Sequence, residues 1–277
     1  MRRNKKILAE NLIAEILTFL IVLVILLPVF WIVITSFKKL PDIVSPVPKF
    51  VFEPTLDNYI SAIRESPFLR YFLNSSIISV STTALVLLLS VPASYGLYRF
   101  EFKLKQMVAL LLLFSRMIFP VAVIIPFFVM FKQIGLIDNY LSVIIMDTVI
   151  NLPLSIWLTG SFIQNIPKDF EEAAMLDGCT GFQAFVRVVL PMILPGLIPV
   201  SIIVFIFTWN ELLFAMVLTG TATKTVTVGI LNYIGYGQTE WGVLCAGTVI
   251  ASLPVIIMAI LIQKYFIRGF TTMVLKG

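Results

Sequence analysis

Three ionisable side chains fall inside long apolar segments of this sequence, namely Arg116, Asp147 and Glu211. A charge that faces lipid at the centre of a bilayer costs about 3 kcal/mol or more, so each must face the interior of a helix bundle or reach toward the membrane surface. Polar and aromatic neighbours accompany the two acids, and together they form a candidate lining for a polar path: Asp147, Asn151, Trp209, Asn210 and Glu211. The same residues could instead join helices or cap kinks, so both interpretations stay open.

Catalytic and metal-binding patterns are scarce in this chain. It has no histidine, which excludes Ser-His triads, imidazole metal sites and imidazole proton relays. Cys179 and Cys245 lie far apart without metal-ligand spacing, and we interpret both as small structural residues. An intramembrane aspartyl protease would need Asp147 with another carboxylate, but neither Asp147 nor Glu211 lies in a glycine-flanked motif that would position a catalytic water. We therefore expect no enzyme, no catalytic residue, no metal and no cofactor of its own.

The composition identifies the medium in which these residues lie. Of 277 residues, 59% are hydrophobic and 13% are charged, whereas soluble domains carry roughly 25% charged residues. Most of the surface must therefore contact lipid or other buried helices. The net charge of +5 is spread over short flanks between apolar runs rather than in one patch, which argues against a nucleic-acid partner.

Six segments are long and apolar enough to cross a bilayer, since a spanning helix needs about 20 mostly apolar residues. They cover approximately residues 16–37, 73–98, 107–131, 141–163, 195–219 and 244–262. The first follows four basic residues but lacks a small-residue cleavage site, which favours a retained signal anchor. We predict an all-α polytopic membrane protein, with residues 1–277 forming a single transmembrane domain.

The basic residues also predict an orientation. One side of the six spans receives twelve Lys and Arg residues and the other receives seven, so both termini and the 164–194 loop should be cytoplasmic. Residues 38–72, 132–140 and 220–243 would then be external. Within the first external loop, Leu56, Tyr59, Ile60 and Ile63 recur at helical spacing after Thr55, which predicts a short amphipathic helix. Such a helix could lie among lipid headgroups or receive a soluble partner.

The loop between the fourth and fifth spans is too patterned for a simple linker. Pro167 suits the first position of a helix, acidic residues follow it, and Gly178 is placed to end the helix in a left-handed cap. Thr180 and Gln183 then form a capping box for a second short helix, whose length Pro191 should limit. Small residues allow close approach of another protein, so the first helix could occupy a partner's groove, although it could also be a lid over helix ends.

The spacing of this loop resembles a known signature. Glu172-Ala173-Ala174, then Gly178, then Val188-Val-Leu-Pro191 is similar to the signature loop of binding-protein-dependent ABC importer permeases, with Val188 where isoleucine is usual. Other stretches point to the carbohydrate branch, represented by the smaller maltose-system permease. These are residues 55–59, 70–75, 151–157, 209–211 and the ending 265–277, in which Phe270, Met273 and Leu275 are bulkier than the branch pattern.

The resemblance implies a function and its participants. In that family the loop is a coupling helix that docks on a separate ATPase subunit, which binds the ATP and Mg. The implied coupling residues are Glu171, Glu172, Ala173, Ala174, Asp177 and Gly178. The implied partners are a second permease, an ATPase dimer and an extracytoplasmic sugar-binding protein, in a prokaryotic inner membrane. The path residues would then contact a sugar through hydroxyl groups and ring faces, and the 220–243 loop would reach toward the binding protein. A proton- or sodium-coupled carrier would leave the Gly178 loop unexplained.

Overall fold

The structure is a computed structural model that describes residues 2–64, 66–117, 120–235 and 239–274. Throughout these residues the regular elements are helices, which confirms the predicted all-α membrane protein. Five helical segments are long and apolar enough to span a bilayer, and a bent pair of helices makes a sixth candidate. The five are Ala14–Ser36, Phe68–Arg99, Tyr140–Gln164, Gly181–Trp209 and Trp241–Gln263.

The chain forms two compact units, which are described separately. The first comprises Met1–Phe68 and Ile230–Ala251, and the second comprises Leu69–Gly229 and Ser252–Gly277. The first unit holds α1 (Arg2–Ser36), α2 (Leu40–Ile43), α3 (Asp57–Arg64), the 3-10 turn η2 (Leu231–Tyr233) and the start of α13 (Trp241–Val274). The second holds nearly all of α4 (Phe68–Arg99) and the helices from α5 to α12, followed by the rest of α13.

In the first unit, α3 is the amphipathic helix predicted from residues 55–63. The Thr55 hydroxyl accepts a hydrogen bond from the Asp57 N–H at 3.1 Å, which caps the helix. The Tyr59 hydroxyl lies 2.8 Å from that of Ser36, so this member of the predicted stripe turns toward the end of α1. The other members remain exposed: Leu56, Ile60 and Ile63.

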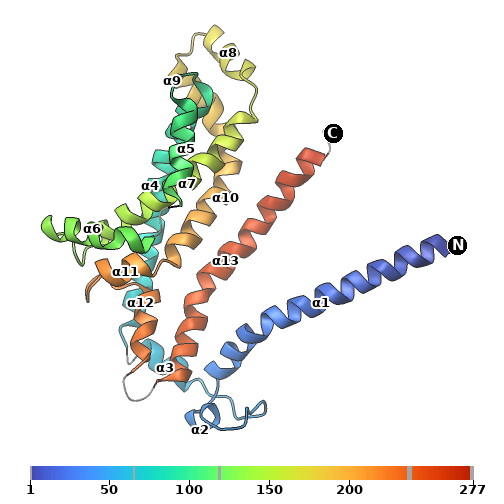
Figure 1. The fold of residues 1–277 in the computed structure, drawn as a ribbon, viewed down its shortest axis with the longest axis vertical. Helices are drawn as coiled ribbons and strands as arrows, with labels where there is room; N and C mark the ends of the chain where they lie inside the picture. The colour runs from blue at the N-terminus through green and yellow to red at the C-terminus, as the bar shows by residue number, and fades with distance from the viewer. Residues whose placement is uncertain (1, 65, 118–119, 236–238, 275–277) are drawn as a thin grey trace. The chain divides into compact units, whose positions relative to one another are not determined.

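The second unit is built on α4, α7 (Tyr140–Gln164) and α10 (Leu190–Trp209) (Figure 1). The Ser94 hydroxyl donates to the carbonyl of Ile156 at 2.9 Å and thereby joins α4 to α7. Gly160 permits a closer approach, because a Cβ at this position would overlap the Tyr98 ring. A buried apolar cluster closes the same end of the unit, and it consists of Val91, Ile163, Ile166, Phe185, Val189 and Ile193.

Two predicted spans are interrupted by breaks. The predicted 107–131 span is divided into α5 (Lys105–Ser115) and α6 (Pro120–Gln133), whose axes differ by 92°. Pro120 begins the second of these helices, consistent with its missing N–H. The predicted 195–219 span begins earlier and ends at Trp209, and the short helix α11 (Leu213–Leu218) follows it.

Pro191 does not end the second helix of the 164–194 loop, contrary to our prediction. α9 (Gly181–Ala184) continues through a π-helical turn, η1 (Phe185–Val189), directly into α10. A proline ring clashes with the carbonyl four residues earlier in a regular α-helix. The wider turn carries a bond from the Leu190 N–H to the Phe185 carbonyl, and it lets the helix continue through the proline.

Candidate functional site: a helix beyond the spans and polar residues within them

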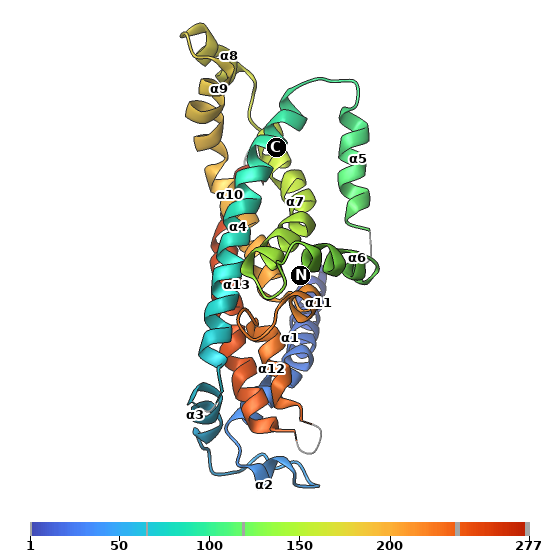
Figure 2. The ribbon, with the colours of Figure 1, turned by 90° about the vertical axis from the view of Figure 1, so that its left-hand side faces the viewer.

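The short helix α8 (Asp169–Leu176) is the first of the predicted functional elements. It lies with α9 at one end of the second unit, beyond the ends of α7 and α10 in both views (Figures 1 and 2). Acidic residues fill its first turn, where the helix dipole favours negative charge. The Thr180–Gln183 capping box is present and starts α9, which confirms that prediction. α8 is therefore a defined helix held between two turns.

Gly178 ends α8 as predicted. Its φ is +91°, and the Gly178 N–H donates to the Met175 carbonyl at 3.0 Å, while the Cys179 N–H reaches Ala174 at the same distance. These are the bonds of a left-handed C-cap, which glycine adopts without steric cost. No heavy atom of the described chain would lie within 4 Å of a Cβ at this position. The described chain therefore leaves room for a Cβ at this position, and the left-handed φ is what disfavours other residues here.

The six predicted coupling residues divide into two groups. Glu172, Ala173, Asp177 and Gly178 are exposed, and Ala174 is partly exposed. Exposed apolar side chains lie beside them, since Leu176 is 89% exposed and Phe182 is 75% exposed. A polar face that carries such apolar groups is suited to contact with a partner protein. Glu171 differs, because it is buried within its own chain.

The burial of Glu171 depends on two residues that the sequence did not single out. Its carboxylate forms an ion pair with Arg99 Nε at 2.5 Å and accepts a hydrogen bond from the Tyr95 hydroxyl at 2.7 Å. Both partners lie on the last turns of α4, more than seventy residues away in sequence. A basic residue at the end of a span is common, so no local signal identified Arg99 as a partner.

Asp147 and Asn151 lie one turn apart on α7 and are both buried, at 1% and 4% exposure. The Asn151 side-chain amide donates to the Asp147 backbone carbonyl at 2.9 Å. Among the described residues, neither carboxylate oxygen of Asp147 has a hydrogen-bond partner. These two predicted path residues therefore face inward, in agreement with the cost of exposing them to lipid.

The other three predicted path residues follow one another but differ in surroundings. Trp209 is 3% exposed and packs against Phe72 and Phe205, with ring centres 5.2 and 5.6 Å away. Glu211 accepts 2.8 Å hydrogen bonds from the backbone N–H groups of Phe214 and Ala215, and so caps α11. Asn210 is the exposed member. The structure thus gives Trp209 and Glu211 structural contacts, and leaves Asn210 accessible.

Arg116 directly follows the last residue of α5, and its side chain reaches the middle of α7. Its Nη1 donates to the carbonyl of Ile150 at 3.2 Å, and its guanidinium carbon lies 5.7 Å from the centre of the Phe207 ring. The side chain is exposed, and within the described ranges no carboxylate pairs with it. An oriented but exposed charge at this depth is suited to a polar path or to a neighbouring subunit rather than to lipid.

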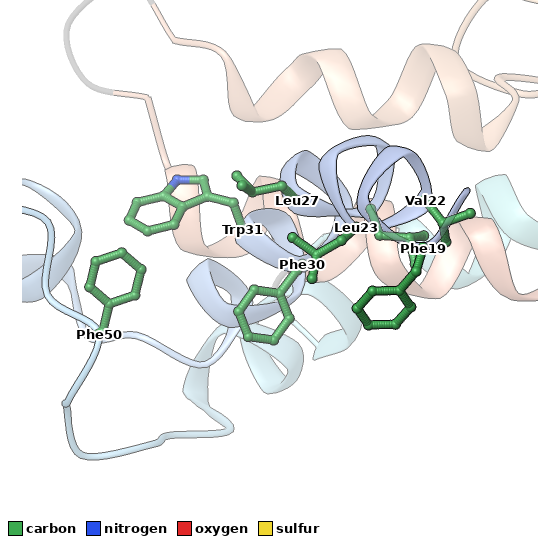
Figure 3. Close-up of a pocket in the computed structure, with 8 residues that line it drawn as sticks. Phe19, Val22, Leu23, Leu27, Phe30, Trp31 and Phe50 are labelled. Carbon is green, nitrogen blue, oxygen red and sulfur yellow. The ribbon is translucent and has the colours of Figure 1, made fainter. Parts of the chain in front are cut away.

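A groove of about 560 Å³ follows one side of α1 in the first unit (Figure 3). Six apolar side chains from Phe19 to Phe30 line it, together with Trp31 and Phe50, whose rings meet edge to face at 5.8 Å. This lining offers a single indole N–H to a polar ligand. We therefore do not place the polar path here.

A polar clamp fixes the start of the predicted 220–243 loop, at the end of the second unit opposite α8. The Asp138 carboxylate accepts hydrogen bonds of 2.8 to 3.1 Å from the N–H groups of Gly220, Ala222 and Thr223 and from the Thr223 hydroxyl. The Asn74 amide donates to the carbonyls of Ala222 and Lys224, and Tyr140 donates to Asn74. Residues 220–224, which begin this predicted external loop, are therefore held in place by hydrogen bonds with two other parts of the chain.

The clamp changes the acidity of Asp138. Partial burial favours the neutral carboxyl, but the hydrogen bonds from Thr223, Ala222 and Gly220 favour the charged form more strongly, and they lower its pKa from 3.8 to about 2. Asp138 also adopts a φ of +55°, a left-handed conformation that aspartate tolerates better than most residues. The residue is therefore a charged anchor at neutral pH.

The helical spans, the inward polar residues and the helix held beyond the spans define a class, which is a multi-pass membrane transport subunit. The chain belongs to the family of binding-protein-dependent transport system inner membrane components, which its residues 87–272 match. It is the permease subunit of a binding-protein-dependent importer. The resemblance noted in the 172–191 loop is thus confirmed at the level of the family.

Three similar proteins illustrate the relationship. The trehalose transport system permease protein SugB of Mycobacterium tuberculosis is 35% identical over 95% of this chain and 96% of its own length. The trehalose/maltose transport system permease protein MalG of Thermococcus litoralis is 32% identical over 93% of this chain and 94% of its own. A crystal structure of a bacterial ABC transporter for alginate has a chain with a TM-score of 0.78, 24% identity and coverage of 92% and 96%. This last likeness supports the fold alone.

Proposed function

We propose that the chain forms, with a second permease subunit, the membrane path of an ATP-driven importer for a sugar. An extracytoplasmic binding protein delivers the sugar, and a separate ATPase dimer binds the ATP and Mg and docks on α8. The chain itself needs no cofactor for this role. The observation that carries the proposal is α8, a capped helix beyond the spans that presents Glu172, Leu176 and Gly178 outward.

The surface of α8 supports docking for physical reasons. Exposed apolar groups such as Leu176 and Phe182 are unfavourable in water and become favourable when a partner covers them. Glu172 adds a charge that a basic residue of the ATPase would pair with, and Gly178 leaves room for close approach of a partner backbone. A lid over helix ends would instead bury its apolar side chains within its own chain.

Sugar as the substrate class rests on the names of relatives. SugB and the Thermococcus MalG are transport permeases for trehalose or for trehalose and maltose, and both align over nearly the whole of this chain. Asn210 and Arg116 are the exposed polar residues we place along the path, because donors and acceptors that face an aqueous route would meet sugar hydroxyls. Asp147, Asn151, Trp209 and Glu211 would support that route from behind.

The proposal includes a topology and a location. Docking on an ATPase requires α8 to be cytoplasmic, which agrees with the excess of basic residues on that side. Both termini are then cytoplasmic, in the inner membrane of a prokaryotic cell, and the Asp138 clamp and α3 are external. The clamped loop would face the binding protein.

The experiment uses the chain coexpressed with its second permease, ATPase and binding protein. We expect the four to copurify, and sugar-loaded binding protein to stimulate ATP hydrolysis and uptake in proteoliposomes. Gly178→Asp should abolish ATPase docking, or uncouple ATP hydrolysis from sugar uptake, while the membrane yield of the chain stays normal. The reason is that a φ of +91° is strained for aspartate and that its side chain would enter the contact. Glu172→Lys should weaken docking by reversing a charge. Wild-type copurification and coupled uptake in both variants would refute the docking assignment.

A further inference from the structure

A buried ion pair ties α8 to the membrane spans. Arg99, the last residue of α4, contacts Glu171 in the first turn of α8 at 2.5 Å, and their side chains are only 7% and 9% exposed. Arg99 Nη2 also donates to the carbonyl of Ile166 at 2.9 Å, just after the end of α7. One guanidinium therefore holds the end of α4, the end of α7 and the start of α8 together.

The second oxygen of the Glu171 carboxylate is held as well. The Tyr95 hydroxyl donates to it at 2.7 Å. The Tyr95 ring packs on Phe185, with centres 4.5 Å apart, and Phe185 belongs to the buried cluster that closes this end of the unit. Glu171 is thus fixed in position from α4 by two side chains, one charged and one neutral.

Neighbouring carboxylates on α8 have different surroundings. Successive residues of an α-helix point about 100° apart, and here Glu171 turns into its own chain while Glu172 remains exposed. Apart from Arg99 and Tyr95, α8 is joined to the spans by the short connections 165–168 and 177–180 and by its packing on α9 and η1. Such connections can bend, so movement applied to α8 would be partly lost in them.

Stability alone does not explain a pair in this position. Removing two charges from water offsets most of their mutual attraction, so buried ion pairs add little net stability, whereas losing one partner leaves an uncompensated charge. What the pair does supply is a fixed geometry. The close contact of Tyr98 with Gly160 extends that geometry, because it packs α4 tightly against α7 at the same end.

We propose that Glu171, Arg99 and Tyr95 form the mechanical joint through which movement of α8 reaches α4 and α7. They are positioning residues that touch neither substrate nor nucleotide. The inference rests on the proposed docking of α8 on the ATPase, and it adds the route by which that docking drives the spans. It also changes the role of Glu171, which was predicted to dock on the ATPase. Glu171 instead transmits movement within the chain, and Glu172 faces the partner.

The test compares Glu171→Gln, Arg99→Gln and Tyr95→Phe in the complete importer in proteoliposomes. We expect all three to copurify with the ATPase and to hydrolyse ATP, while the number of ATP molecules hydrolysed per sugar transported rises at least tenfold for Glu171→Gln and Arg99→Gln. Tyr95→Phe should raise it about two- to fivefold, because the ion pair remains. The charge swap Arg99→Glu with Glu171→Arg should recover part of the coupling.

A matched control is the exposed pair Glu101 and Lys105, 2.9 Å apart next to the end of α4. Glu101→Gln with Lys105→Gln removes the same charges nearby, and its coupling ratio should equal that of the wild type. A second measurement places spin labels at two exposed positions that the docking proposal does not use, Asp169 on α8 and Leu88 on α4. ATP-driven displacement of the α4 label relative to the second permease should shrink in Arg99→Gln while that of α8 persists.

The outcomes separate the joint from the docking. A wild-type coupling ratio in both Glu171→Gln and Arg99→Gln would overturn the joint, and so would loss of ATPase binding in both, since the pair would then only shape the docking surface. Absence of recovery in the charge swap, with all single variants well assembled, would also count against it. The docking of α8 has its own test. It is refuted if Glu172→Lys and Gly178→Asp copurify with the ATPase and transport sugar like the wild type.

Discussion

Asp138→Asn removes the charge at the centre of the polar clamp while keeping one acceptor oxygen and the shape of the side chain. The lowering of its pKa from 3.8 to about 2 corresponds to roughly 2.4 kcal/mol at about 1.4 kcal/mol per unit. The carboxylate is partly exposed, so solvent screening reduces this to about 1–2 kcal/mol. We expect that loss in the local stability of residues 220–224.

Hydrogen exchange measures this loss directly. At pH 7, the amides of Gly220, Ala222 and Thr223 donate to the carboxylate, and a loss of 1–2 kcal/mol should speed their exchange by about 5- to 30-fold. Asp138→Ala, which keeps no acceptor, should speed it more. Asp42→Asn, which removes a carboxylate paired with Lys49 in the first unit, serves as a control and should leave these amides unchanged.

The sign of the pH dependence follows from the lowered pKa. A carboxyl whose pKa falls on folding stabilises the protein fully above its unfolded value near 3.8, and this stabilisation is lost as the pH falls through about 2. The difference in thermal stability between wild type and Asp138→Asn should be constant from pH 7 to about 5 and shrink toward pH 2. Equal exchange rates at pH 7 in wild type, Asp138→Asn and Asp138→Ala would refute the clamp.

Three further predictions concern topology, the path and packing. With Cys179 and Cys245 replaced, a cysteine at position 181 should react with an impermeant reagent only from the cytoplasmic side, and labelling from outside would overturn the orientation. Asn210→Ala and Asn151→Ala should lower uptake more than membrane yield, whereas normal uptake in both would leave them as helix-packing residues. Gly160→Ala should destabilise the chain by about 1–3 kcal/mol, because the new methyl group meets the Tyr98 ring; thermal unfolding would detect this, and Tyr98→Ala should relieve part of it.

Much of the fold could be predicted because lipid imposes strict requirements on length and polarity. Apolar runs of about 20 residues located the spanning helices, and the local chemistry of Thr180, Gln183 and Gly178 located the caps of the loop. These signals act between near neighbours in sequence. The family could also be predicted from spacing in the 172–191 loop, and the match over residues 87–272 confirms it.

Most of the missed features depend on distant partners or on compensation, and Glu211 was missed because it lies at a break within an apolar run. A hydropathy profile does not show that Glu211 caps the following helix α11, because the stretches on both sides of Glu211 are mostly apolar. Pro191 predicted an end to the helix, but a wider turn compensates for it. The partners of Asp138 and Glu171 lie more than seventy residues away. Nothing local distinguished Glu171, which turns inward, from Glu172, which does not.

The π-helical turn at Phe185–Val189 also sets a rotational phase. An i to i+5 bond takes up one residue more than a regular turn, and each residue of an α-helix advances the face by about 100°. The π-helical turn therefore rotates α9 by about 100° about the helix axis, relative to the orientation α9 would have if the whole segment were a regular α-helix. A single-residue deletion between 185 and 189 could restore a regular helix without breaking it, yet it would turn α9 and the α8 segment before it toward a different neighbour.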